Sequence, residues 1–279
     1  MSPQLLDYPR YAWQLLQGQR SWMERMASEQ RQRDIAAYLD SGQPLRVLDL
    51  ANGRLRPQYT LLRAAGHQVY GIDLVNRPYL GWKDQAYRVA RSLFTWRLGL
   101  PHQISRGPTL TCGDVGALPY PDASFDLITS IAAFEHFLDV PAVVAELGRV
   151  LRPGGVVWVS IHMFTSPSGG HNLSFVEMPL RTVPEGVDAW DHLRKRRLPF
   201  SVPLNEWRQA QYLDTFAQHF EILQHYCTTR EGEELLTPTI EAELAGYSRD
   251  ELTCAAYVIV ARQPVTSDEN YKAAADENC

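Results

Sequence analysis

The sequence has no apolar run near the ~18–20 residues that a membrane span requires. Its first residues also lack the basic start and apolar stretch of a secretory signal. Only four of its 279 residues are cysteines, and they lie far apart without metal-ligand spacing. The net charge of −5 argues against a general nucleic-acid binder. We therefore expect a reduced, cytoplasmic protein without a membrane span or a nucleic-acid partner.

The histidines do not indicate a metal site either. His162, His171 and His192 fall in one region, but their spacing is not that of a compact ligand set. We therefore predict no metal. The basic run Arg-Lys-Arg-Arg at residues 194–197 fits either a solvated loop or a contact to an anionic substrate or partner.

Strand and helix patterns alternate from residue 45 to 161. Such alternation predicts parallel strands joined by crossover helices, and therefore a doubly wound α/β sheet. Asp139 can cap one of the helices, and Pro141 suits its first turn. The strands are expected at residues 45–50, 67–73, 109–112, 125–129, 156–161, 220–226 and 257–261.

Three segments flank or interrupt this pattern. Residues 1–44 form a predicted N-terminal helical lid, whose aromatic residues fit either core packing or a cover over the site. Its apolar positions, such as Trp13, Leu16 and Met26, recur at helical spacing. The main domain spans residues 45–263, and residues 264–279 are predicted to be a flexible tail. Within the main domain, residues 163–204 are too long for a plain connection, so we expect a mobile insertion on the substrate side.

Glycine is scarce in the loop after the first strand. Doubly wound sheets bind ligands outside the carboxyl ends of their strands, where this sequence places Asp49, Gly53, Asp73 and Asp114. A dinucleotide fingerprint would need glycine at positions 51, 53 and 56, and only Gly53 is present. The sequence therefore argues against a dehydrogenase.

Several motifs in order resemble another family. They are Val-Leu-Asp-Leu at 47–50 with Ala-Asn-Gly at 51–53, Gly-Ile-Asp at 71–73, Gly-Asp at 113–114, Phe-Glu-His at 134–136 and Leu-Arg-Pro-Gly-Gly at 151–155. Together they resemble the class I S-adenosylmethionine-dependent methyltransferases, most closely the small-molecule branch, over residues 45–162. The resemblance implies a Rossmann-like, seven-stranded, mostly parallel sheet with an N-terminal helical extension and an insertion after the fifth strand. It also implies S-adenosyl-L-methionine as the cofactor.

The resemblance assigns a set of cofactor contacts. Ala51 replaces the first glycine of the family's loop and is expected to keep ordinary backbone angles, whereas Leu55 replaces the third and is expected to be the strained position. A decayed loop is the alternative. The predicted contacts are Asp49 near the amino-acid end of the cofactor, Ala51 and Gly53 in the loop, Asp73 on the ribose hydroxyls with Leu74 beside it, Asp114 and Val115 at the adenine, and Ser130 and Ile131 near the methionine part.

Two histidines are the candidates for catalysis. His171 follows a Gly-Gly pair that lets the chain bend, so it could act as a general base with a near-neutral pKa, or it could be structural. His136 is the second candidate. We predict a methyltransferase that O-methylates a small-molecule acceptor in specialised or sugar/lipid metabolism. The alternative is a protein that keeps the fold without catalysis or without methyl transfer. The sequence leaves open a homodimer.

Overall fold

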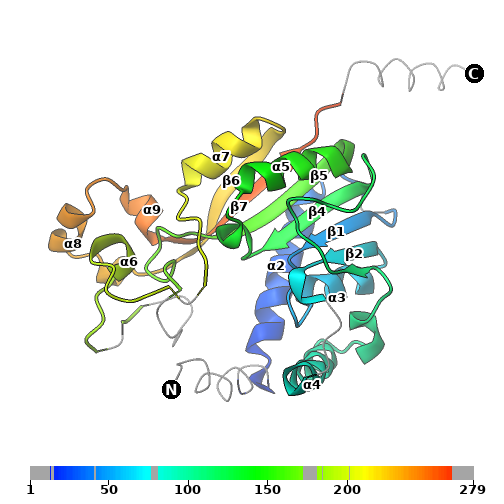
Figure 1. The fold of residues 1–279 in the computed structure, drawn as a ribbon, viewed down its shortest axis with the longest axis horizontal. Helices are drawn as coiled ribbons and strands as arrows, with labels where there is room; N and C mark the ends of the chain where they lie inside the picture. Colours follow the sequence, from blue (N-terminus) through cyan, green and yellow to red (C-terminus); the bar gives the residue numbers. More distant parts are fainter. Residues whose placement is uncertain are drawn as a thin grey trace, which may run out of the picture.

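The computed structural model describes residues 13, 16–40, 42–76, 81–171, 181–183, 185–200 and 202–265. Within them, one sheet has the strand order β3-β2-β1-β4-β5-β7-β6 (Figure 1). β7 is antiparallel to both of its neighbours, and the other pairings are parallel. This confirms the doubly wound, mostly parallel α/β fold. The strands are β1 (Arg46–Leu50), β2 (Gln68–Ile72), β3 (Leu110–Thr111), β4 (Phe125–Ile131), β5 (Leu151–His162), β6 (Glu221–Arg230) and β7 (Cys254–Arg262).

Helices connect the strands where the sequence predicted crossovers. The predicted cap is present, because Asp139 Oδ1 accepts from the Ala142 N–H at 3.1 Å and a proline lies in the first turn of α5. The helices are α2 (Gln19–Ile35), α3 (Pro57–Ala64), α4 (Trp82–Arg97), α5 (Val140–Val150), α6 (Asp191–Arg194), α7 (Gln209–Ala217), α8 (Pro238–Glu243) and α9 (Arg249–Thr253). The short 3₁₀ helices are η1 (Leu74–Asn76), η2 (His102–Ser105), η3 (Phe134–His136) and η4 (Glu233–Leu235). No helix in the described part is both long and apolar enough to cross a membrane.

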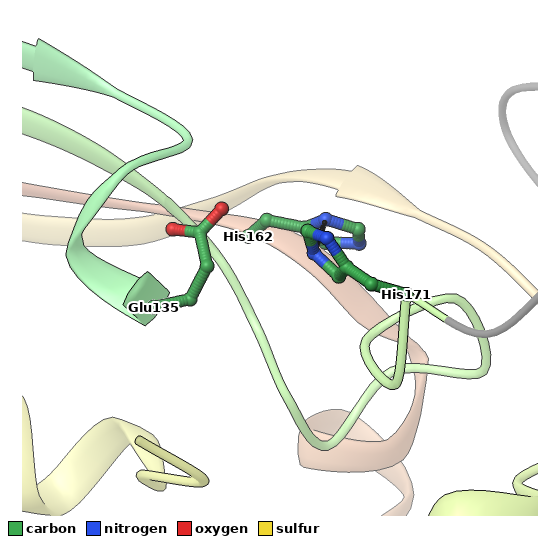
Figure 2. Close-up of side chains that lie close together, drawn as sticks. All are labelled: Glu135, His162 and His171. Carbon is green, nitrogen blue, oxygen red and sulfur yellow. Dashed lines mark hydrogen bonds between the residues drawn. The ribbon is translucent and has the colours of Figure 1, made fainter. Parts of the chain in front are cut away.

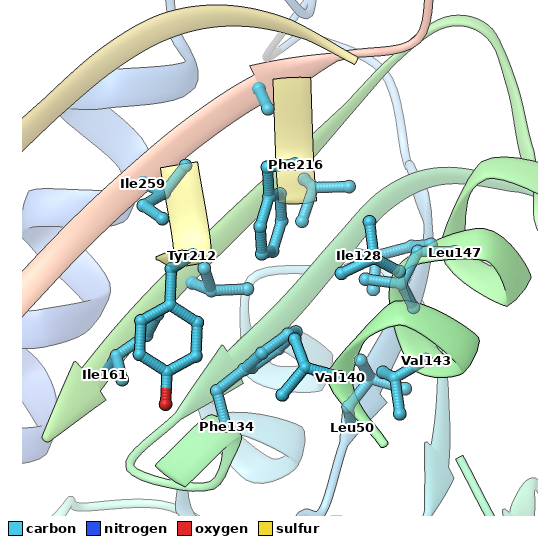
Figure 3. Close-up of a cluster of buried hydrophobic side chains, with 14 of the residues drawn as sticks. Leu50, Ile128, Phe134, Val140, Val143, Leu147, Ile161, Tyr212, Phe216 and Ile259 are labelled. Carbon is cyan, nitrogen blue, oxygen red and sulfur yellow. The ribbon is translucent and has the colours of Figure 1, made fainter. Parts of the chain in front are cut away.

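The sheet has an apolar core on each face. Leu50 and Ile128 point toward α5 and α7, where they meet Leu147 and Phe216 (Figure 3). Val47 is on the opposite face with the core residues that α2 and α3 contribute. Successive side chains of a strand point to opposite faces. Strands that are buried on both sides therefore read as continuous apolar runs, which is why the sequence located them.

The N-terminal helix does not bury the face that the sequence predicted. Trp13 is 61% exposed and Met26 is 37% exposed. The buried side chains of α2 are mostly polar and include Glu24, Arg31 and Asp34. The reason is that these groups have partners inside the protein: the indole Nε1 of a buried tryptophan in β5, Trp158, donates to Asp34 Oδ2 at 2.7 Å. Residues 1–12 lie outside the described part, so the predicted lid remains a prediction.

Two other boundaries differ from the predicted ones. β5 begins at Leu151, five residues before the predicted start at residue 156, and its register against β4 shifts near its beginning. α6, α8 and α9 form a separate group beside the sheet (Figure 1). The buried Trp190 is part of a small apolar cluster with Leu244 and Leu252 in this group. The sequence analysis did not predict α8 or α9.

Candidate cofactor and catalytic site

The strand order reverses between β1 and β4, which makes the carboxyl edge of these strands the expected ligand crevice. Leu50, the last residue of β1, lies in register with the end of β2 and with Ser130 of β4. The next residues along the three strands are Ala51, Asp73 and Ile131. Three of the predicted cofactor residues therefore lie at neighbouring strand ends on one edge of the sheet.

The loop after β1 carries the retained glycine. Gly53 has φ +63, and a Cβ on it would meet no atom within 4 Å, so open space adjoins this residue. Ala51 has φ +49, so the prediction of ordinary backbone angles was wrong. Its N–H continues the sheet by donating to the Ile72 carbonyl at 2.8 Å, which helps to hold it in this conformation. The other left-handed residue is Arg56, with φ +55, and not the expected Leu55.

Asp73 holds this loop in place. Its Oδ2 accepts from the Gly53 N–H at 2.8 Å, and its Oδ1 accepts from the Val75 N–H at 2.9 Å. A carboxylate oxygen can accept more than one hydrogen bond, so further acceptor capacity remains for ribose hydroxyls. Asn76 supports the same loop by donating from Nδ2 to Asn52 Oδ1 at 2.9 Å. The sequence analysis singled out neither asparagine, although Asn76 lies only three residues beyond Asp73.

Asp49 is buried beneath the loop. It is 3% exposed, and its Oδ2 has no hydrogen-bond partner in the described part of the chain. Burial raises the pKa of Asp49 to about 7, while the positive charge of Arg31 opposes the rise. Arg31 enters from α2, is itself buried, and donates to Gln58 Oε1 at 2.7 Å. The sequence analysis missed Arg31 because nothing local distinguishes it from the other arginines of α2. The contact of Asp49 with a cofactor remains a prediction.

The predicted adenine contacts differ in exposure. Asp114 is exposed, and its Oδ1 accepts from the Gly116 N–H at 2.9 Å, which forms a tight turn after β3. Val115 is buried in the core face that includes α5. Leu74 is 68% exposed, beside Asp73. The roles assigned to these residues remain predictions.

His171 and His136 meet near the ends of β4 and β5. The rings of these two histidines are edge-on, with 5.0 Å between their centroids. His171 Nε2 also lies 3.0 Å from Nδ1 of His162, the last residue of β5. Burial, together with the neighbouring His162, lowers the pKa of His171 to about 3, so the predicted near-neutral value was wrong. Glu135 lies close to His162 and His171 (Figure 2). The sequence analysis did not select Glu135, although it is adjacent to His136.

The Gly-Gly pair serves close packing. A Cβ on Gly169 would lie 2.3 Å from the Met163 carbonyl oxygen, and one on Gly170 would lie 2.7 Å from Cβ of His192. Most of residues 163–171 are buried, so the expected mobile insertion does not fit this part of the segment. Residues 172–180 lie outside the described part.

The basic run at residues 194–197 is engaged in ion pairs. Arg194 Nε lies 2.6 Å from Glu243 Oε2, and Lys195 Nζ lies 3.1 Å from Asp188 Oδ2. The third residue of the run forms a similar pair with a glutamate at 2.6 Å. These contacts favour a structural role in the surface of the α6 region over an anion site.

Comparison with known proteins assigns the fold to a family. Residues 48–159 match the family described as a methyltransferase domain. Over residues 48–159 the chain therefore carries a methyltransferase domain of the class I S-adenosylmethionine-dependent type. This confirms the predicted family and its cofactor, S-adenosylmethionine.

Curated relatives are similar to part of the chain. A demethylmenaquinone methyltransferase from Deinococcus radiodurans is 54% identical over 127 residues, which cover 44% of this chain and 45% of that protein. A malonyl-[acyl-carrier protein] O-methyltransferase from Serratia marcescens is 30% identical over 131 residues, which cover 46% and 45%. The chain thus spans less than half the length of these relatives. A crystal structure of an S-adenosylmethionine-dependent methyltransferase from Mesorhizobium loti is 22% identical, with a TM-score of 0.49 and coverage of 83% and 96%.

The residues present fit this cofactor. S-adenosylmethionine has no pyrophosphate, so the loop needs less close backbone approach than a dinucleotide requires, and one alanine for glycine is compatible with it. The open space at Gly53 and the carboxylate of Asp73 adjoin each other at the reversal of strand order. These features match what the family's cofactor needs at its ribose end.

Proposed function

We propose that this chain is an S-adenosylmethionine-dependent methyltransferase that methylates an oxygen atom of a small-molecule acceptor. The observation that carries the proposal is the contact between Asp73 and the Gly53 N–H at 2.8 Å. It fixes a carboxylate beside an open stretch of backbone at the position where doubly wound folds bind ligands. A decayed cofactor loop would have little reason to keep this arrangement.

Relatives support the class of acceptor. Two of the curated relatives are named as a malonyl-[acyl-carrier protein] O-methyltransferase and a 27-O-demethylrifamycin SV methyltransferase. The second is 29% identical over 110 residues, which cover 39% of this chain and 36% of that protein. Their names describe oxygen atoms of organic acceptors as methylation sites. We extend this reaction class, but not these substrates, to the present chain.

When bound, S-adenosylmethionine supplies an electrophilic methyl group. The residues of this chain bind and orient the cofactor. Asp73 holds the loop and accepts hydrogen bonds from the ribose hydroxyls, and Asp114 accepts one from the adenine amino group. His171 and His136 are the candidates for taking the acceptor proton, and the lowered pKa of His171 makes it the weaker base, which favours His136. Nδ1 of His136 lies 2.9 Å from the Pro203 carbonyl, which can only accept, so Nδ1 carries the proton and Nε2 keeps its lone pair. His136 is therefore in the tautomer that a proton acceptor at Nε2 requires.

Calorimetric titration of the protein with S-adenosylhomocysteine tests cofactor binding without turnover. Asp73→Asn should weaken binding by about 2 kcal/mol, or roughly 30-fold, because charge-assisted hydrogen bonds are lost. Asp122→Asn, which alters an exposed carboxylate before β4, is the matched control and should leave affinity unchanged. Melting temperatures of both variants separate a loosened loop from a lost ligand contact. Absence of binding by the unaltered protein would favour the alternative, a scaffold that keeps the fold without the cofactor.

Turnover is tested with S-adenosylmethionine and a panel of phenols, hydroxyquinones, sugars and carboxylic acids. The expected product carries a new O-methyl group, detected by NMR, and S-adenosylhomocysteine is released with it. His136→Ala should lower the rate by ~10²–10⁴-fold with cofactor affinity nearly unchanged. His136→Gln should recover little, because an amide does not take a proton at neutral pH. Methylation at carbon or nitrogen would contradict the oxygen assignment, and full activity of His136→Gln would move the search for the base to His171.

A further inference from the structure

Three side chains from separate elements converge beside the cofactor edge. Glu135 lies in η3, His162 ends β5, and His171 follows the buried segment after it. One potential ligand atom from each lies within 4.8 Å of the others, and Figure 2 shows Glu135 beside the two imidazoles. The sequence analysis predicted no metal site because it considered His192, and not Glu135, as the third ligand beside His162 and His171. His192 is directed elsewhere, with Nε2 at 2.7 Å from the Phe164 carbonyl.

Glu135 is the buried carboxyl group of this cluster. The residue is 1% exposed, and within the described part of the chain neither carboxylate oxygen has a hydrogen-bond partner. Burying a carboxyl group without partners is costly, and a native site of this kind calls for an ion or a water.

The tautomer of His162 is fixed by its outer contacts. The Ser168 hydroxyl donates its single proton to Glu231 Oε1, which also accepts from the Ser168 N–H at 3.0 Å. The hydroxyl oxygen must therefore accept from Nε2 of His162, at 2.8 Å. Nδ1 of His162 then carries a lone pair, and it faces His171. A histidine whose outer nitrogen donates into a carboxylate-bound network is the usual arrangement of a metal ligand.

The spacing of the two imidazoles suits a shared ion. His171 Nε2 lies 3.0 Å from His162 Nδ1, which without an ion is a hydrogen bond from one ring to the other. Two nitrogens at about 2.1 Å from one ion lie about 3.0 Å apart in octahedral geometry and slightly further apart in tetrahedral geometry. An ion in place of the shared proton therefore preserves this nitrogen–nitrogen distance, while the two rings turn so that their lone pairs converge on it and Glu135 moves closer.

We propose that Glu135, His162 and His171 form a site for one divalent first-row transition ion of the Zn²⁺ or Fe²⁺ class. Two imidazoles and one carboxylate are the donor set that such ions take with coordination positions left open. His136 borders the open side, with Nε2 3.8 Å from Glu135 Oε1. Its Nε2 lone pair is available to the ion or to a molecule bound to the ion.

The position of the site suggests what an open coordination position would hold. Glu135 lies shortly after β4 and His162 ends β5, at the same carboxyl edge of the sheet as Asp73. If the proposed function holds, an acceptor oxygen bound to the ion would lie on the methyl side of the cofactor. Metal binding itself does not depend on that function, because it needs neither cofactor nor acceptor.

The experiment uses the full, untagged chain after chelator treatment, titrated with Zn²⁺ by calorimetry and with Co²⁺ by visible absorption. We expect one ion per chain and a Co²⁺ spectrum typical of nitrogen and oxygen ligands. Glu135→Gln and His162→Gln should each weaken binding by roughly 100-fold or more, and Ser168→Ala by ~10–100-fold through loss of the outer contact. His219→Gln, at an exposed histidine outside the cluster, is the matched control and should change nothing.

Two results would overturn the proposal: no stoichiometric binding by the unaltered chain, or affinities of Glu135→Gln and His162→Gln equal to that of His219→Gln. Ser168→Ala keeps the ligand set intact, so it still tests the site if the other variants fail to fold. A parallel titration with S-adenosylhomocysteine keeps the two proposals separate. Cofactor binding without metal binding removes only the ion, and metal binding without cofactor binding removes only the proposed function.

Discussion

Replacing Asp49 with asparagine should raise the stability of the protein relative to the unaltered chain, and this gain should grow as the pH rises from acid to alkaline. Asp49 is 3% exposed, and burial raises its pKa in the folded protein to about 7, from 3.8. Arg31 opposes this rise, whereas Glu24 and Asp73 add to it. The folded state therefore holds a proton on Asp49 over a pH range in which the unfolded chain has released it. Asparagine resembles the protonated carboxyl and has no proton to lose.

The sign of the effect follows from proton linkage. Because the pKa of Asp49 is raised on folding, its contribution to stability is most favourable below about pH 4 and is lost as the pH rises to about 7. One unit of pKa corresponds to about 1.4 kcal/mol. Most of this loss occurs between pH 5 and pH 8, and it amounts to roughly 2–3 kcal/mol. For a domain of this size that corresponds to a difference of roughly 5–10 °C in melting temperature.

The measurement is the melting temperature of Asp49→Asn minus that of the unaltered protein, followed from pH 5 to pH 8. Other buried acids, such as Glu135, are present in both proteins, so their effects cancel. Asp122→Asn, which alters a carboxylate whose side chain is 79% exposed, controls for the loss of a charge and should change stability little. A difference for Asp49→Asn that stays constant over this range would refute the reasoning. If Asp49 also contacts the cofactor, the same variant will bind S-adenosylhomocysteine more weakly while being more stable.

Three further predictions concern the scaffold. Arg31→Met should lower the free energy of unfolding by about 3 kcal/mol, because it leaves Asp49 without its buried cation, and the loss should be larger at high pH. Denaturant titration at two pH values measures this loss. A loss that does not grow with pH would contradict the prediction. Asp139→Ala should cost about 1 kcal/mol in the same assay through loss of the α5 cap, and Asp139→Asn should restore most of it. Gly169→Ala should cost about 1–3 kcal/mol, because the added methyl group meets the Met163 carbonyl, and an unchanged melting temperature would show that this segment can move aside.

The sequence by itself determined the sheet and its binding edge. Apolar runs such as residues 47–50 and 156–161 identify strands buried on both faces, because each strand in the middle of such a sheet packs against helices above and below. Asp139 and Pro141 mark a helix start through local hydrogen bonding and a fixed φ. Asp73 could be placed beside Gly53 because parallel strands end at one edge. These inferences needed only the chain direction and side-chain chemistry near each element.

Backbone conformation in the cofactor loop needed the structure. Ala51 adopts a left-handed conformation that its residue type disfavours, whereas Leu55, which was expected to be strained, does not adopt one. Local preference gave the wrong answer because pairing with β2 and the carboxylate of Asp73 hold the loop from outside. A residue takes an unfavourable conformation only when such surroundings impose it.

Only the tertiary structure decided which polar groups are buried together. Arg31 and Asp49 are 18 residues apart and lie in different elements, and nothing in the periodicity of α2 indicates that its polar side is the buried one. Glu135 and His171 are also separated in sequence, and they meet because two strands end side by side and the segment after β5 packs back against them. Spacing along the chain predicts which side chains share one face of a single helix or strand. A ligand set or a buried ion pair depends instead on distances between side chains of different elements, and only the packing of those elements fixes these distances.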